Sequence, residues 1–216
     1  MRSLMISSFL VLTIIVLSTG DSFAIITTEH LTDQELVAMM TENAFCSEGR
    51  IGDQLGAATF ELDIGSEHSN PAQTAQFEWP NGTPVAFTLS YDSQTNSASF
   101  TVGSTTLVFT PVPPFTEIFV RARAVNEGSS MLVYDLVLDG EPVPDSASTE
   151  GPGGADTVWI SGGELSDGFT LTGMSLMTWS GEIPTQSRLA YQVKPSALGF
   201  VPVERSSWGR AKSLSD

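Results

Sequence analysis

Alternating apolar and polar residues dominate the chain from about residue 59 onward. In residues 59–64, Phe60, Leu62 and Ile64 alternate with two acidic residues, which is typical of a strand with one buried face. The same period predicts strands at 76–79, 84–91, 99–102, 106–109, 117–125, 130–139, 157–160, 169–179 and 188–193. Turn residues separate them, including Asn81-Gly82. The pattern predicts an all-β, two-sheet antiparallel β-sandwich of jelly-roll-like form.

The phase of the alternation predicts the core. We expect eight apolar side chains to share one core: Phe60, Leu62, Phe87, Leu89, Val120, Leu136, Phe169 and Leu171. In residues 130–139 the same rule places one set of side chains, Leu132, Tyr134, Leu136 and Leu138, on one face. The opposite face then receives Val133, Asp135 and Val137.

Two segments depart from the strand pattern. Residues 25–47 form a short N-terminal segment in which Thr32 and Glu35 have the spacing of a capping box, so a helix is predicted over 33–43. This helix is expected either to pack on the sandwich as a lid or to be a loose leader. Residues 140–155 are rich in glycine, proline, serine and acids, and predict a long loop.

The first 24 residues have the form of a secretory signal peptide. Arg2 precedes an apolar stretch over residues 4–17, and Ser22 and Ala24 place small residues at the two positions that a signal peptidase reads. The stretch is shorter than the roughly 20 residues needed to span a bilayer. We therefore expect cleavage after Ala24, a mature chain beginning at Ile25 and no transmembrane helix in that mature chain.

Charge is spread unevenly along the 216 residues, whose formal net charge is −16. Residues 25–187 hold three basic and 22 acidic residues, whereas residues 188–216 hold five basic and two acidic ones. Because residues 25–187 are so acidic, they repel nucleic acid and anionic membranes, and we expect no nucleic-acid partner. The sandwich is predicted over 48–194, with a separate, flexible C-terminal tail over 195–216.

This ordered series of motifs resembles a known family: GRIGD (49–53), FELDIG (60–65), FEWPNG (77–82), FTLSY (87–91), IFVRARA (118–124), LVLDG (136–140), WISG (159–162), GFTLTG (168–173) and SRLAYQVK (187–194). Together they resemble the choice-of-anchor W domain of bacterial surface and secreted proteins, over roughly residues 46–194. The resemblance implies an exported domain with a variable C-terminal anchoring device, and no catalytic residues to carry over. The sequence has no LPxTG-like motif, no Pro-Glu-Pro signal and no final apolar helix. Arg205, Trp208, Arg210 and Lys212 are therefore the candidate docking residues of the tail.

Catalytic chemistry finds little support in the residues. His30 and His68 lie outside any recognisable catalytic motif, and the chain has no Gly-x-Ser-x-Gly elbow. One cysteine and two separated histidines do not make a zinc ligand set. A buried or free thiol is the favoured interpretation of Cys46, and a lipid anchor the alternative. Acids are so numerous that a chance pair could satisfy the spacing of a glycoside hydrolase, which stays open as a second alternative.

Two binding hypotheses remain. Five acids crowd one stretch and suggest a weak calcium loop, with no other cofactor expected: Asp139, Glu141, Asp145, Glu150 and Asp156. Aromatic residues on or beside the predicted strands suggest stacking on sugar rings, with Trp79, Trp159 and Trp179 as the first candidates and Tyr91 and Tyr134 beside them, although the phase of most of them also fits a core.

We accordingly predict a non-catalytic β-sandwich protein of unknown ligand, secreted or attached to the cell surface. The first alternative is a carbohydrate-binding or adhesive module. The expected partner is a polysaccharide or a component of the cell envelope.

Overall fold

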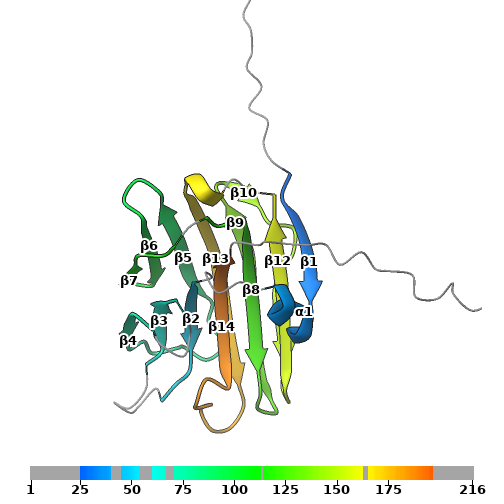
Figure 1. The fold of residues 1–216 in the computed structure, drawn as a ribbon. Helices are drawn as coiled ribbons and strands as arrows, with labels where there is room; N and C mark the ends of the chain where they lie inside the picture. Colours follow the sequence, from blue (N-terminus) through cyan, green and yellow to red (C-terminus); the bar gives the residue numbers. More distant parts are fainter. Residues whose placement is uncertain are drawn as a thin grey trace, which may run out of the picture.

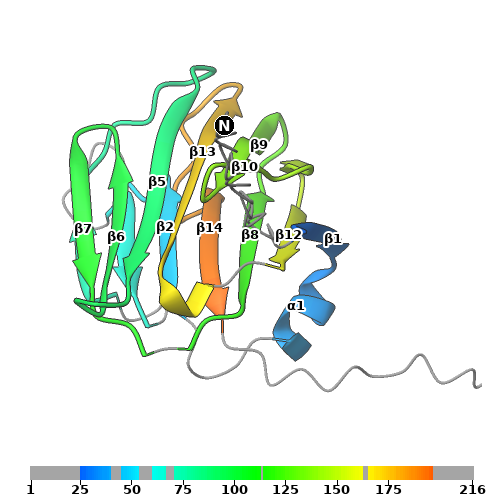
Figure 2. The same ribbon diagram turned by 90° about the horizontal axis from the view of Figure 1, so that it is seen from above.

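The computed structural model describes residues 25–39, 45–53, 60–66, 71–112, 114–162 and 165–196. They form two antiparallel sheets of seven strands each, packed face to face, with one short α-helix outside (Figures 1 and 2). The predicted two-sheet antiparallel β-sandwich is therefore confirmed. Residues 1–24, which are predicted to be a signal peptide, lie outside the described residues, as do His68 and the tail residues 197–216. No helix in the described part is both long and apolar enough to cross a membrane.

Sheet 1 has the strand order β1-β12-β8-β14-β2-β3-β4. Its strands are β1 (Thr27–Leu31), β2 (Cys46–Arg50), β3 (Leu62–Gly65), β4 (Gln73–Ala75), β8 (Glu117–Ala124), β12 (Gly154–Ser161) and β14 (Leu189–Ser196). Helix α1 (Asp33–Met39) lies against the end of this sheet formed by β1 and β12 (Figure 2).

Sheet 2 has the order β10-β9-β13-β5-β6-β7, and β11 also pairs with β9. Its strands are β5 (Val85–Asp92), β6 (Ser97–Val102), β7 (Thr105–Phe109), β9 (Ser129–Leu138), β10 (Glu141–Pro142), β11 (Ala147–Glu150) and β13 (Phe169–Trp179). A single 3-10 turn, η1 (Leu165–Asp167), precedes β13.

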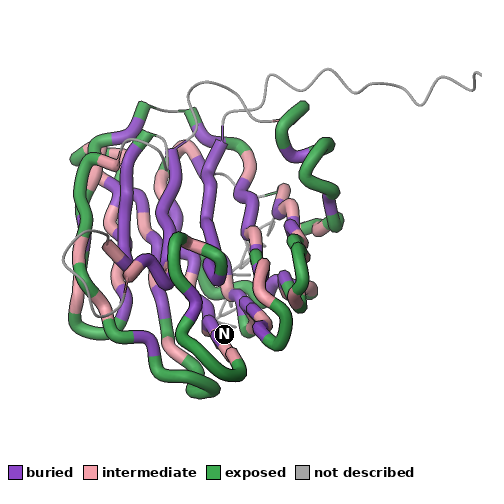
Figure 3. The backbone as a smooth tube through the Cα atoms, turned by 90° about the horizontal axis from the view of Figure 1, so that it is seen from below, coloured by how far each residue is buried: buried purple, intermediate pink, exposed green. Residues whose placement is uncertain are grey.

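The core between the sheets is aromatic at its centre. Tyr191 of β14 contacts rings of three other segments, with centroids 5.2 Å from Phe87, 6.0 Å from Trp79 and 6.3 Å from Phe100. Seven of the eight predicted core residues are buried in this cluster, as the buried central strands in Figure 3 illustrate. Phe60 is the exception: it is half-buried and stacks under the Arg50 guanidinium, 3.8 Å from the ring centroid.

The N-terminal segment is part of the fold. β1 pairs with β12 over five residues, and Leu36 of α1 packs with Leu31 and Phe119 on the outer side of sheet 1. The capping box is present: the Glu35 backbone N–H donates to Thr32 Oγ1 at 3.3 Å, and the Thr32 N–H donates to Glu35 Oε2 at 2.9 Å. The helix therefore begins as predicted and packs on the sandwich over Asp33–Met39, and residues 40–43 of its predicted span lie outside the described residues.

Three other expectations are corrected by the structure. Residues 76–79 are not a strand, because the neighbouring pairing ends with β4 at Ala75. The predicted loop 140–155 contains β10, β11 and the start of β12, which pair with β9 and β8. β14 continues two residues past the predicted boundary, because Pro195 lies opposite Ile118 and its carbonyl accepts the Phe45 N–H at 3.3 Å.

Candidate functional site

A β-bulge in β9 is the main irregularity of sheet 2. Thr172 of β13 lies opposite Val137, whereas Met174 lies opposite Tyr134, so Gly173 alone faces two residues of β9. The extra residue is Asp135, which has a φ of 50° and is exposed. A bulge of this kind bends a strand and redirects a side chain.

The bulge explains why the predicted phase of β9 is only half right. Met131 and Val133 point into the core before it, and Leu136 and Leu138 after it, so Leu132 and Tyr134 lie on the outer face. Gly173 makes the change possible. A Cβ at Gly173 would lie 2.7 Å from Leu136 Cδ2 and 2.8 Å from Phe87 Cζ, which is closer than packed carbon atoms tolerate.

On its other side β9 faces a segment that interrupts the ladder. β10 pairs up to Pro142 opposite Val137, and β11 resumes with Ala147 opposite Val133. Residues 143–146 therefore lie opposite only three residues of β9. The Val143 N–H still donates to the Leu136 carbonyl at 2.8 Å, but Pro144 has no backbone N–H to donate, so the pairing is interrupted between Val143 and β11.

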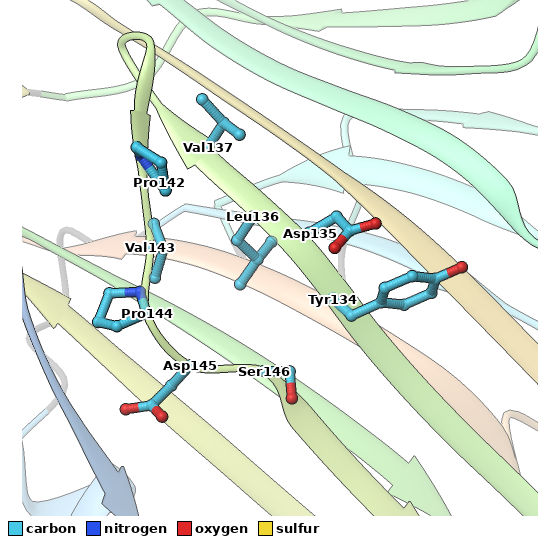
Figure 4. A pocket seen from close by; sticks show the side chains of 9 residues that line it. All are labelled: Tyr134, Asp135, Leu136, Val137, Pro142, Val143, Pro144, Asp145 and Ser146. Carbon is cyan, nitrogen blue, oxygen red and sulfur yellow. The ribbon is translucent and has the colours of Figure 1, made fainter.

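The separation leaves an open hollow of about 390 Å³. Figure 4 shows the segment Pro142–Ser146 beside β9, and the Tyr134 ring pointing from β9 away from that segment; both belong to the lining. Leu136 and Val143 are buried and supply an apolar floor. The polar residues of the lining are Tyr134, Asp135, Asp145 and Ser146. An apolar recess with a few polar groups is the usual composition of a ligand site.

The carboxylate of Asp145 is held by the N-terminal strand, because Thr28 Oγ1 donates to its Oδ2 at 2.5 Å. Nearby, His30 Nδ1 lies 2.8 Å from Asp156 Oδ1, and this hydrogen bond raises the pKa of His30. The other oxygen of Asp156 accepts the Ser148 N–H at 2.8 Å. These contacts join β1, β11 and β12 beside the hollow.

The five acids of the predicted calcium loop do not converge. Asp145 and Asp156 make the contacts just described, and Asp139 Oδ1 accepts the Thr170 N–H at 2.7 Å. Glu141 and Glu150 are exposed on different strands. Within the described ranges, no three histidine, cysteine, aspartate or glutamate side chains are placed to hold a metal ion together.

The three tryptophans predicted to stack on sugars do not form an exposed row. Trp79 is 2% exposed, and its Nε1 donates to the Arg50 carbonyl at 2.8 Å. Trp159 is partly buried on sheet 1 and donates to Glu117 Oε2 at 2.6 Å, while Trp179 packs against the core from sheet 2. Cys46 is a buried free thiol whose pKa is raised by burial, as the favoured interpretation predicted.

The outer face of sheet 2 adjoins the hollow through Tyr134. Its outward-pointing side chains on β5, β6, β7, β9 and β13 alternate with core residues. Apart from Asp135 at the bulge, none of those in the central part of these strands is charged. We call the uncharged set the sheet 2 face: Ala86, Thr88, Ser90, Ser99, Thr101, Thr106, Val108, Ser130, Leu132, Tyr134, Val137, Thr170, Thr172, Met174, Leu176 and Thr178.

The outer face of sheet 1 is charged by contrast. Four of the five lysine and arginine residues in the described ranges point outward from it: Arg50, Arg121, Arg123 and Lys194. Among them Glu48 of β2 lies opposite Asp63 of β3, and both are buried. Glu48 accepts a hydrogen bond from Gln192 Nε2 at 3.1 Å, whereas within the described ranges neither oxygen of Asp63 has a hydrogen-bond partner.

No family model matches the chain, and no curated protein matches it either. The identification of the hollow as a candidate binding site therefore depends on its geometry alone. Sequence reasoning named Tyr134 among the candidate sugar-stacking aromatic residues but missed Asp135 and Ser146, because period-two alternation gives no sign of a bulge. The pair Pro142 and Pro144 beside β9 was the available signal. The predicted tail residues Arg205, Trp208, Arg210 and Lys212 lie outside the described residues.

Proposed function

We propose that this chain is a non-catalytic, exported β-sandwich module, secreted or attached to the cell surface, that binds carbohydrate in the hollow beside the β9 bulge. The observation that carries the proposal is the composition of the hollow. A sugar presents C–H groups on its ring faces and hydroxyl groups around its rim. The C–H groups can pack on the floor of Leu136 and Val143 and on the ring of Tyr134. The hydroxyl groups can donate hydrogen bonds to the carboxylates.

Export is supported by the signal-peptide pattern of residues 1–24 and by the resemblance to the choice-of-anchor W domain. The single cysteine is compatible with an oxidising compartment, since no intramolecular disulfide is needed. The accumulated negative charge favours a neutral ligand or one with hydrogen-bond donors over an anionic one.

The surroundings of the two carboxylates in the hollow favour binding over hydrolysis. A glycosidase needs one carboxyl kept protonated by a buried, apolar setting so that it can act as general acid. Asp135 is exposed, and Asp145 accepts a hydrogen bond from Thr28. Neither side chain is enclosed in the way a general acid requires.

The test is titration calorimetry with soluble oligosaccharides selected from a glycan array, using the mature chain. Tyr134→Ala and Asp135→Asn should each weaken binding at least tenfold. Asp139→Asn is the matched control, because Asp139 is also exposed with a positive φ of 52° but lies outside the hollow. Equal affinity for Asp135→Asn and the wild type would refute the site, and release of shortened sugars would establish the hydrolase alternative.

Export is tested separately. Cell fractionation followed by mass measurement should find the chain outside the cytoplasm with Ile25 at its N-terminus. Exported protein that retains Met1 would contradict the predicted cleavage.

A further inference from the structure

The sheet 2 face carries a regular array of hydroxyl groups. Four threonines on four neighbouring strands lie in one row, with Thr88 opposite Thr172 and Thr101, and Thr101 opposite Thr106. Neighbouring strands are about 4.8 Å apart, so the row has a fixed spacing. Thr101 Oγ1 lies 2.9 Å from Thr106 Oγ1, and this hydrogen bond holds the two side chains in place.

The lack of charge on this face is unusual for the molecule. The chain has a formal net charge of −16, and the outer face of the opposite sheet is rich in charged groups. A face selected only for solubility would carry interspersed charges. The sheet 2 face is instead broad, uncharged and bordered by acids.

The negative charge of the chain also limits which class of partner can bind this face. Two copies of so acidic a chain repel each other, and acids such as Asp92 and Asp135 stand beside the face and disfavour anions. A neutral polymer with both hydroxyl and C–H groups is not repelled by the net charge of the chain or by these acids. It can exchange hydrogen bonds with the threonine row and cover the apolar side chains of Met174 and Leu176.

We propose that the sheet 2 face is a docking platform for a neutral polysaccharide presented as an extended or packed surface, continuous with the hollow. Tyr134 joins the two, because it lines the hollow and lies opposite Met174 of the face. The inference rests on the proposed carbohydrate-binding function and assigns the polymer to a different set of residues.

The experiment is a depletion assay with insoluble cellulose, chitin and β-1,3-glucan, alongside calorimetry with the soluble sugar of the hollow. Thr101→Lys and Thr106→Lys place a charge in the row and should reduce polymer binding at least tenfold. Thr74→Lys is the matched control, since Thr74 is an exposed strand residue on the outer face of sheet 1. Melting temperatures establish that each variant is folded.

The outcomes separate the two proposals. Loss of polymer binding with intact binding of the soluble sugar supports the platform. Polymer binding unchanged by either substitution overturns the platform, and so does a wild type that binds soluble sugars but no polymer; both leave the hollow in place. A dimer in light scattering that Thr101→Lys dissociates would assign the face to a second copy instead. Failure of both assays with the wild type would overturn both proposals.

Discussion

Replacing Asp63 with asparagine should stabilise the sandwich at neutral pH. Asp63 is fully buried on β3, and neither of its carboxylate oxygens has a hydrogen-bond partner among the residues that the structure describes. Burial, with a further contribution from the Glu48 carboxylate opposite, raises its pKa from 3.8 to about 8, although Arg50 acts in the other direction. The folded protein therefore keeps Asp63 protonated over a pH range in which the unfolded chain releases the proton.

The sign and size of the effect follow from this difference in pKa. The contribution of protonated Asp63 to the free energy of unfolding is fully present below about pH 4, and it is lost as the pH rises towards 8. Each unit costs about 1.4 kcal/mol, so the loss at pH 7 is about 4 kcal/mol. An asparagine has nearly the same shape and no charge, so Asp63→Asn should recover most of this free energy of unfolding at pH 7 and little of it at pH 4.5.

The assay is urea unfolding of the wild type and Asp63→Asn from pH 4.5 to 8.5. Glu48→Gln should flatten the wild-type slope in part, because it removes the charge opposite Asp63. Asp92→Asn is the contrasting control, since hydrogen bonds from Thr95 and Gln94 lower the pKa of Asp92. That change should reduce stability without altering the slope above pH 5. A constant difference between wild type and Asp63→Asn at every pH would refute the reasoning.

Two further predictions concern β1 and the bulge. His30→Gln should lower the melting temperature more at pH 5.5 than at pH 8.5, because the Asp156 hydrogen bond raises the pKa of His30 and stabilises its protonated form. The loss should stay below about 1 kcal/mol, since His30 is half-exposed, and an equal loss at both values would contradict it. Gly173→Ala should cost about 1–3 kcal/mol in urea unfolding through contact with Leu136. The double variant with Leu136→Ala should be less destabilised than the sum of the single changes, and strict additivity would argue against that contact.

Most of the fold could be predicted because period-two alternation reports burial directly. Leu62, Leu89 and Leu171 are buried as predicted, since each lies in a strand whose two faces differ in polarity. Phe60 was assigned to the core wrongly because it precedes β3 and stacks with Arg50 instead. The sequence predicts that the sandwich ends at Lys194, yet Pro195 lies opposite Ile118 in β14 and its carbonyl accepts a hydrogen bond from Phe45.

The hollow could not be predicted because it depends on an inserted residue. Alternation assumes that every residue advances the strand by one position, and Asp135 breaks that assumption. Everything on the N-terminal side of the bulge is then assigned to the opposite face, which is why Tyr134 was expected with Leu136. Composition predicts a loop for residues 140–155, although β10 and β11 give this segment a defined position beside β9.

The two outer faces of the sandwich should act independently, and this independence tests the functional assignment. The aromatic core separates Asp63 on sheet 1 from Thr101 on sheet 2, and distant sites without shared partners contribute additively to stability. Asp63→Asn should therefore change the pH dependence of unfolding and leave polysaccharide binding unchanged. Thr101→Lys should weaken polysaccharide binding and leave the pH dependence of unfolding unchanged. Because a ligand at 100 times its Kd stabilises the native state by about 2.7 kcal/mol, the soluble sugar of the hollow should raise the melting temperature of both variants by similar amounts.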